Sequence, residues 1–176
     1  MHQKVVKHQY PLIDQDPHAS RVVRYMRPSD YGYWAAGTAG FPGLLYLWQY
    51  VDPVKTTPQG MRTLMRLGGL FGFVGGFMFA YQRSSMRFWG WTENKREEEL
   101  DMKEMKQRLA EGKSLYGESD QPEWIQGIAA RYSTFSQLKF QAFPWFNLVN
   151  HPYHGVDPAK YGATAEDITK SKPPSQ

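Results

Sequence analysis

The sequence contains no cysteine. This absence excludes disulfide bonds, thiolate ligation of zinc or iron–sulfur clusters, and a cysteine nucleophile. The sequence also lacks a nucleotide-binding loop, a Ser–His–Asp arrangement and a carboxylate pair suited to acid–base catalysis. A net charge of +4 is too small to predict a nucleic-acid partner, and a mean hydropathy of −0.62 argues against a chain that lies mostly in a membrane. We therefore predict no enzyme activity, no cofactor, no bound metal and no small-molecule substrate.

Two uncharged runs dominate the first half of the chain. The first covers residues 31–51, where 21 residues between Asp30 and Asp52 carry no charge. As a helix this run would span roughly 31 Å, about the thickness of the hydrocarbon core of a bilayer. Its Tyr and Trp residues gather at the two ends, as aromatic side chains do at the two membrane–water interfaces. We predict a first transmembrane helix over residues 31–51.

The second run lies between Arg66 and Arg83 and has 16 uncharged residues, or roughly 24 Å of helix. This length is short, but the two Arg side chains can extend outward to the interfaces. We predict a second transmembrane helix over 64–82, joined to the first by a loop over 52–63. Small residues at a spacing of three or four let helix backbones approach closely in lipid. The predicted helix-packing residues are Ala36, Gly40, Gly43, Gly68, Gly72 and Gly76.

Two other interpretations compete with the membrane hairpin. A soluble, glycine-rich helix pair is disfavoured because each glycine in a helix costs about 1 kcal/mol relative to alanine. A phosphate-binding loop at residues 68–72 would need the GxGxxG spacing or a GK[ST] ending, and neither is present. The hairpin therefore remains the better interpretation.

Basic residues are unequally distributed about the predicted hairpin. Seven Lys or Arg side chains flank its outer ends, whereas the loop side has three. Because positive charge is retained on the inner side of a membrane, this count favours both termini on the inner side, which in a mitochondrion would be the matrix side. We predict that Arg21, Arg24 and Arg27 contact anionic lipid head groups, with cardiolipin among the candidates. Residues 83–92, rich in aromatic and basic side chains, are predicted to form the interfacial exit from the membrane.

Residues 93–112 are predicted to form a charged helix. The pairs Glu99–Lys103 and Glu104–Arg108 have the i,i+4 spacing and the order that favour side-chain ion pairs. The apolar stripe of this helix has three members, Met102, Met105 and Leu109. Such a stripe is too narrow to support a domain core, so we expect either a solvated helix or a helix that lies on a partner surface.

The two ends of the chain, residues 1–30 and 113–176, are predicted to be extended arms of largely irregular structure. A short helix is expected over 123–138. The aromatic, proline-broken stretch that follows cannot bury itself without other elements, and such stretches usually form a binding surface. The predicted partner-docking residues are Phe143, Trp145 and Phe146.

A second feature of the C-terminal arm is an H-x-x-H motif. His151 and His154, with Asp157 close behind, have a spacing that metal ligands can adopt. Pro152 interrupts any helix at this position, however, and histidines in loops usually have structural roles. We therefore favour a structural role over metal binding.

Several stretches of this sequence resemble a known protein family. They are residues 10–18 (YPLIDQDPH), 21–31 (RVVRYMRPSDY), 127–131 (GIAAR), 144–151 (PWFNLVNH) and 154–161 (HGVDPAKY). In this order they are similar to the fungal 21 kDa-type accessory subunits of mitochondrial NADH:ubiquinone oxidoreductase, which is respiratory complex I. The resemblance covers most of the chain, and the charged helix is its least distinctive part.

The resemblance implies a supernumerary, non-catalytic subunit of the membrane arm of complex I in the inner mitochondrial membrane, part of the respiratory electron-transport chain. Its partners would be other membrane-arm subunits and membrane lipids. The predicted fold is an all-α membrane protein, a two-helix transmembrane hairpin with a charged helix and two irregular arms. Two other classes stay open: a transient assembly factor or membrane adaptor, and a stand-alone membrane enzyme or transporter.

Overall fold

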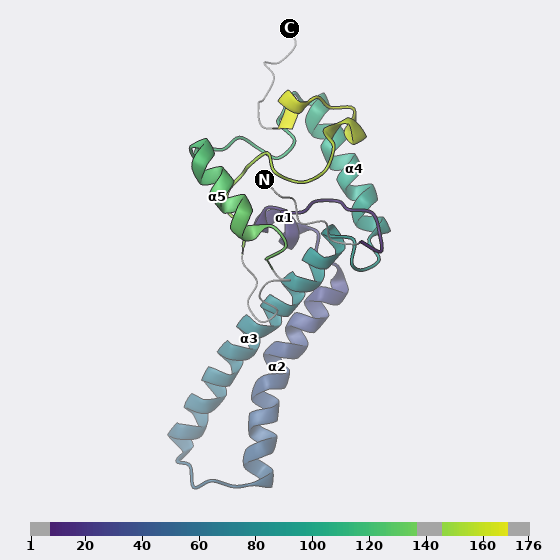
Figure 1. Cartoon of the computed structure of the whole chain (residues 1–176). Coiled ribbons are helices and arrows are strands. Elements are labelled where there is room, and N and C mark those ends of the chain that lie inside the picture. Colours follow the sequence, from purple (N-terminus) through teal and green to yellow (C-terminus); the bar gives the residue numbers. More distant parts are fainter. Residues whose placement is uncertain (1–7, 137–145, 169–176) are drawn as a thin grey trace. The chain divides into compact units, whose positions relative to one another are not determined.

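The computed structural model describes residues 8–136 and 146–168, and it divides the chain into two compact units. Unit 1 contains the described residues of 8–25, 85–136 and 146–168, and unit 2 contains residues 26–84. Within the described ranges every regular element is helical, so the prediction of an all-α chain is confirmed. Figure 1 shows the helices in order along the chain.

Unit 2 consists of two long antiparallel helices, α2 (Pro28–Val51) and α3 (Pro58–Phe88), of which the last four residues of α3 belong to unit 1. Pro28 starts α2 because its missing N–H is at a position where no helical hydrogen bond is needed. Asp30 accepts a hydrogen bond from the Arg27 backbone N–H at 2.8 Å and so fixes this helix start. The connection is shorter than the predicted loop over 52–63, because α3 already begins at Pro58.

Glycines bring α2 and α3 close together in unit 2. A Cβ atom added to Gly72 would lie 2.5 Å from the carbonyl oxygen of Gly37, and one added to Gly76 would lie 2.7 Å from that of Trp34. Distances below 3.0 Å to backbone atoms are not tolerated, so only glycine fits at these two places in α3. A Cβ added to Gly68 would lie 2.7 Å from Leu45 Cδ1, the end of a side chain that can move.

The predicted packing face of α2 is wrong. Gly40 and Gly43 have no atom within 4 Å of an added Cβ, and Ala36 is exposed. The contact is made instead by Gly37, whose added Cβ would lie 2.9 Å from the Cα of Gly76. The sequence pattern identified a face of small residues on α2, but the residue in contact, Gly37, lies one position after the predicted Ala36. One residue step turns a helix by about 100°, so the observed contact face is rotated by that angle from the predicted face.

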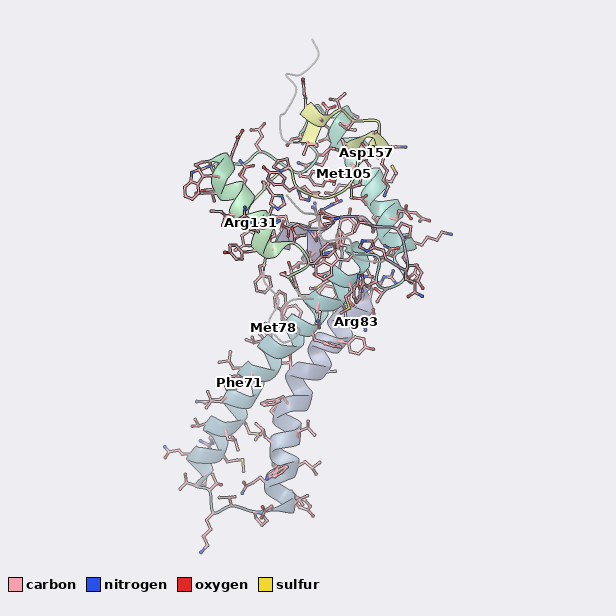
Figure 2. All side chains as sticks on the ribbon, viewed as in Figure 1. Phe71, Met78, Arg83, Met105, Arg131 and Asp157 are labelled. Atoms are coloured by element: carbon pink, nitrogen blue, oxygen red, sulfur yellow. The ribbon has the colours of Figure 1, made fainter. Side chains whose placement is uncertain are left out.

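The outer surface of unit 2 is rich in exposed apolar side chains (Figure 2). Leu44, Trp48, Leu70 and Phe71 are between 57% and 72% exposed. Of the described residues, those in α3 form a helix long and apolar enough to cross a membrane, and α2 does not reach the same hydropathy. The physical reason is that α2 has four Tyr and two Trp, whose polar atoms lower its hydropathy, whereas α3 has one Tyr, no Trp, five Phe and four Met.

Unit 1 contains the short helix α1 (Ala19–Arg24), α4 (Lys95–Ala110), α5 (Glu123–Ser133), and the 3-10 helices η1 (Pro158–Tyr161) and η2 (Ala165–Ile168). One apolar cluster within it has four buried members, Met105, Leu115, Tyr161 and Ala163. The stripe of α4 therefore does contribute to a core, because residues from the C-terminal segment complete it.

The two expected arms are joined to each other in unit 1. The backbone N–H groups of Tyr10 and Ile13 donate to the carbonyl oxygens of Gly90 and Phe88, each at 2.9 Å. Further along, the Ala19 N–H donates to the Asn147 carbonyl oxygen at 2.7 Å. Residues 9–19 thus pair with both later segments of unit 1, and the prediction of separate arms is replaced by a single folded unit.

Candidate functional site

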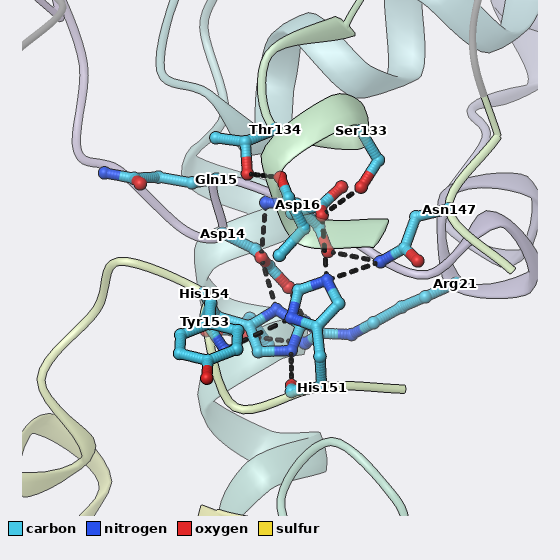
Figure 3. Close-up of polar contacts among 12 residues, drawn as sticks. Asp14, Gln15, Asp16, Arg21, Ser133, Thr134, Asn147, His151, Tyr153 and His154 are labelled. Carbon is cyan, nitrogen blue, oxygen red and sulfur yellow. Dashed lines mark hydrogen bonds and ion pairs between the residues drawn. The ribbon is translucent and has the colours of Figure 1, made fainter. Parts of the chain in front are cut away.

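The distinguishing feature of unit 1 is a group of charged and polar side chains with almost no exposure to solvent (Figure 3). We call it the buried ionic cluster, and its members are Asp14, Asp16, Arg21, Asp101, His151 and His154. Each is at most 6% exposed. The cluster draws on three parts of the sequence: the N-terminal segment, helix α4 and the C-terminal segment.

Arg21 on α1 is at the centre of the cluster. Its guanidinium lies 3.2 Å from Asp14 Oδ2 and forms a second, short ion pair with Asp101. The charged group also lies over the rings of Tyr25 and Phe88, at 5.3 and 5.5 Å from their centroids. Burial alone would lower the pKa of Arg21, but the surrounding carboxylates outweigh burial and raise it, so Arg21 is a permanent cation.

The two histidines pair with the two N-terminal aspartates. His151 Nε2 lies 2.8 Å from Asp16 Oδ2, and its Nδ1 accepts a hydrogen bond from the Tyr153 backbone N–H at 3.1 Å. Asn147 Nδ2 lies 3.1 Å from the same Nε2, so polar neighbours hold the His151 ring at both of its nitrogens.

His154 has different surroundings. Its Nδ1 lies 2.7 Å from Asp14 Oδ1, and its Nε2 lies 2.7 Å from the carbonyl oxygen of His151. An aspartate and a backbone carbonyl group thus hold the His154 ring at its two nitrogens. Tyr116 stacks on this ring with centroids 3.6 Å apart. Asp14 thus lies between Arg21 and His154.

The carboxyl groups of the cluster differ in pKa. Burial raises the pKa of Asp14, but His154 and Arg21 more than offset it, so the net pKa is lowered. For Asp16 and Asp101, burial is the largest effect and leaves the pKa raised despite their partners. Asp14 is therefore firmly ionised, whereas Asp16 and Asp101 have an energetic cost of ionisation.

Polar neighbours complete the cluster. The Tyr161 hydroxyl donates to Asp101 Oδ2 at 2.7 Å, and Ser133 Oγ donates to Asp16. Asn147 Nδ2 donates to the backbone carbonyl oxygen of Asp16 at 3.0 Å. These contacts join η1 to α4, and they join α5 and the C-terminal segment to Asp16 in the N-terminal segment. With its groups paired to one another inside the protein, this cluster is suited to holding segments together.

The metal-site alternative finds no geometric support. His151 and His154 face Asp16 and Asp14, while the Asp157 side chain accepts the Ala159 N–H at 2.9 Å and caps η1. Within residues 8–136 and 146–168, no three His, Asp or Glu side chains are placed to hold a metal ion.

The predicted lipid-contact residues occupy three different environments. Arg21 is buried and paired, so the prediction of a head-group contact is wrong for this residue. The Arg24 side chain is 61% exposed and lies 3.0 Å from Glu104 Oε1. Arg27 precedes α2 in unit 2. The carboxyl groups that pair with Arg21 belong to Asp14, seven residues earlier, and to Asp101 on α4. Counting charges along the sequence does not show that these groups lie next to Arg21.

Glu104 also departs from the sequence-based expectation. Instead of an i,i+4 pair with Arg108, it accepts a hydrogen bond from the Tyr25 hydroxyl and pairs with Arg24. Burial raises the pKa of Glu104, but Tyr25, Arg21 and Arg24 together leave it lowered. The tertiary partners are favoured because Tyr25 and Arg24 together provide a hydrogen-bond donor and a charge at one place.

The predicted docking residues are only partly described. Phe143 and Trp145 lie outside the described residues, and Phe146 is 39% exposed. Sequence reasoning missed Asp14, Asp16 and Asn147 as partners of the histidines. The available signal was two acidic residues shortly before Arg21 and an H-x-x-H motif far along the chain. These motifs show which residue types are present but not which side chains pair with each other.

Comparison with known proteins assigns the chain to a family. Residues 7–93 match the family described as the NADH-ubiquinone oxidoreductase complex I 21 kDa subunit, and residues 102–171 match the C-terminal region of the same subunit. The NADH-ubiquinone oxidoreductase 20.9 kDa subunit of Neurospora crassa is 49% identical over 163 residues, which covers 93% of this chain and 86% of that protein. The chain therefore belongs to the family of 21 kDa-type accessory subunits of NADH-ubiquinone oxidoreductase complex I.

Proposed function

We propose that this chain is a resident, non-catalytic subunit of the membrane arm of mitochondrial complex I, and that it supports assembly and stability of the complex. The observation that carries the proposal is the match to the 21 kDa subunit family over nearly the whole chain. The buried ionic cluster fits this role because its charged groups face one another and hold chain segments in place.

The hairpin α2–α3 is proposed as the anchor in the inner mitochondrial membrane. Its outward side chains are mainly apolar and exposed, which is unfavourable in water and favourable in lipid. Helix α2 has 24 residues, or roughly 36 Å, which is enough to cross a bilayer with some tilt. Its terminal aromatic side chains suit the two interfaces. The excess of basic residues outside the hairpin favours both termini on the matrix side.

A surface for neighbouring subunits is proposed on α5. Trp124, Ile128 and Tyr132 follow at a spacing of four, so they share one face of the helix. They are 67%, 43% and 70% exposed. Tryptophan and tyrosine are enriched at the energetic centres of protein interfaces. This face would act together with Phe143, Trp145 and Phe146, the docking residues proposed from the sequence.

The experiment that tests the function uses mitochondria solubilised in mild detergent and separated on a native gel. The gel is stained for NADH dehydrogenase activity, and the same lane is probed for this chain. A resident subunit co-migrates with the active band at a constant ratio to a core subunit. A chain found only in smaller species would contradict the proposal and favour the alternative, a transient assembly factor.

A further inference from the structure

An open cavity of about 420 Å³ lies in unit 1 between the end of α1 and one face of α4. Its volume is in the range of small-ligand sites. Its charged lining is formed by four basic and two acidic side chains: Arg24, Lys103, Arg108, Lys113, Glu104 and Glu111. The lining therefore has a net charge of +2, the difference between four cations and two carboxylates.

Both carboxylates of this lining are already occupied by donors of the protein. Glu104 accepts the Tyr25 hydroxyl and pairs with Arg24 at 3.0 Å. Glu111 accepts Lys113 Nζ at 2.7 Å and Gln107 Nε2 at 2.8 Å. Both acidic groups therefore have donors of the protein as partners, and the lining has two more cations than carboxylates.

Two cations of the lining have no carboxylate within 4 Å in the part of the chain that the structure describes. Arg108 donates to the backbone carbonyl oxygen of Ser114 at 2.8 Å, which is a neutral acceptor. Lys103 is exposed on α4 and lines the same cavity. Together with Arg24, whose carboxylate partner is Glu104, they provide the cavity with hydrogen-bond donors in excess of its carboxylates.

We propose that this cavity binds a phosphate-bearing anion, either the head group of an anionic phospholipid or a free phosphate ester. A phosphate group offers several acceptor oxygens to the Arg24 and Arg108 guanidinium groups and to the Lys103 ammonium group. A doubly charged phosphate would match the net charge of the lining. The proposal concerns unit 1 alone, so it does not depend on the membrane span or on membership of complex I.

The test compares two charge reversals on α4, Lys103→Glu and the control Lys106→Glu. Lys106 is also exposed on α4 but lies outside the cavity lining, so both variants change the net charge equally. The full chain in neutral detergent is titrated with inorganic pyrophosphate by calorimetry. In a second arm, native mass spectrometry counts phosphatidylglycerol and phosphatidylcholine molecules retained by the same samples. Melting temperatures verify that both variants are folded.

The proposal predicts that Lys103→Glu weakens pyrophosphate binding or phosphatidylglycerol retention about tenfold or more, while Lys106→Glu changes it less than about twofold. Binding in the first arm identifies a free phosphate ester as a ligand, and binding only in the second identifies a lipid head group. Equal losses in the two variants, or no binding in either arm, would overturn the proposal. So would binding of an acidic peptide but not phosphate through Lys103, which would identify a protein partner instead.

Discussion

Each of the two units of this chain is stabilised by its own internal contacts, and the two units use opposite kinds of contact. Unit 2 relies on backbones in close contact, with Gly37, Gly72 and Gly76 at the helix crossing and apolar side chains directed outward. Unit 1 instead buries polar pairs such as Arg21–Asp14 and His154–Asp14 in its interior. The difference is what two solvents would require: lipid tolerates exposed apolar groups, whereas water allows charged groups to be buried only when they are paired.

The comparison predicts that the largest single effect arises in the buried ionic cluster. Replacing Arg21→Met keeps the approximate volume but removes the buried cation that pairs with both Asp14 and Asp101. We expect a loss of about 3–5 kcal/mol in the free energy of unfolding of unit 1. Chemical denaturation followed by circular dichroism measures it. Arg24→Met is the matched control: its exposed pair with Glu104 should contribute less than about 1 kcal/mol. Equal effects in the two variants would refute the central position of Arg21.

In unit 2 the corresponding break is Gly72→Leu, because no side chain fits against the carbonyl oxygen of Gly37. We expect the helices to separate, with a destabilisation of about 1–3 kcal/mol. Since the chain lacks cysteine, Leu44→Cys and Leu70→Cys provide unique sites for spin labels, and their distance reports the separation in lipid. Gly40→Leu serves as control because its added side chain meets open space. An unchanged distance in Gly72→Leu would contradict close packing there.

A smaller effect is expected where one hydroxyl joins η1 to α4. Tyr161→Phe removes the hydrogen bond to Asp101 and leaves this carboxylate with one donor fewer, at a cost of about 1–2 kcal/mol. Urea denaturation of unit 1 measures the change. Tyr153→Phe, at a ring that is 46% exposed, should be close to neutral. If both tyrosine variants were neutral, the hydroxyl of Tyr161 would have no part in holding the C-terminal segment.

The finest test separates Asp14 from Asp16 by pH. The pKa of Asp14 is lowered in the folded chain, so its stabilising contribution is present above the ordinary value of 3.8 and is lost as the pH falls below it. The pKa of Asp16 is raised, so protonation favours the folded state and offsets part of the acid-induced loss. Asp14→Asn should reduce the loss of stability between about pH 6 and pH 3, and Asp16→Asn should enlarge it. Urea midpoints at both pH values give the two slopes, and changes of the same sign in the two variants would contradict the assignment.

The sequence predicted those parts of the fold that depend on local patterns. Uncharged runs and glycine spacing located the two long helices and the packing face of α3, and the charged stretch located α4 to within two residues of each end. The sequence placed the packing face of α2 one residue away from the observed contact. Several small residues along α2 define alternative faces, and only the contact with α3 shows which of these faces is used. The difference is therefore a matter of rotation about the axis of α2.

The ionic cluster was beyond sequence reasoning for a different reason. Asp16 and His151 are separated by 135 positions, and Asp14 and His154 by 140. No periodic pattern links residues at such distances, and a basic stretch next to an uncharged run resembles a membrane-flanking segment. Arg21 was therefore assigned to lipid when its partners are carboxylates of the protein.

The most direct test of the central claim, that one chain places a hairpin in lipid and unit 1 in water, uses single-cysteine variants in mitochondria. Lys55→Cys lies between α2 and α3, Leu70→Cys on the outer face of α3, and Lys106→Cys on α4. A membrane-impermeant maleimide is added to mitochondria without an outer membrane, and again after the inner membrane is opened. We predict labelling of the Lys55→Cys variant at once, of Lys106→Cys only after opening, and of Leu70→Cys in neither case. Labelling of Leu70→Cys as readily as Lys106→Cys would contradict the claim.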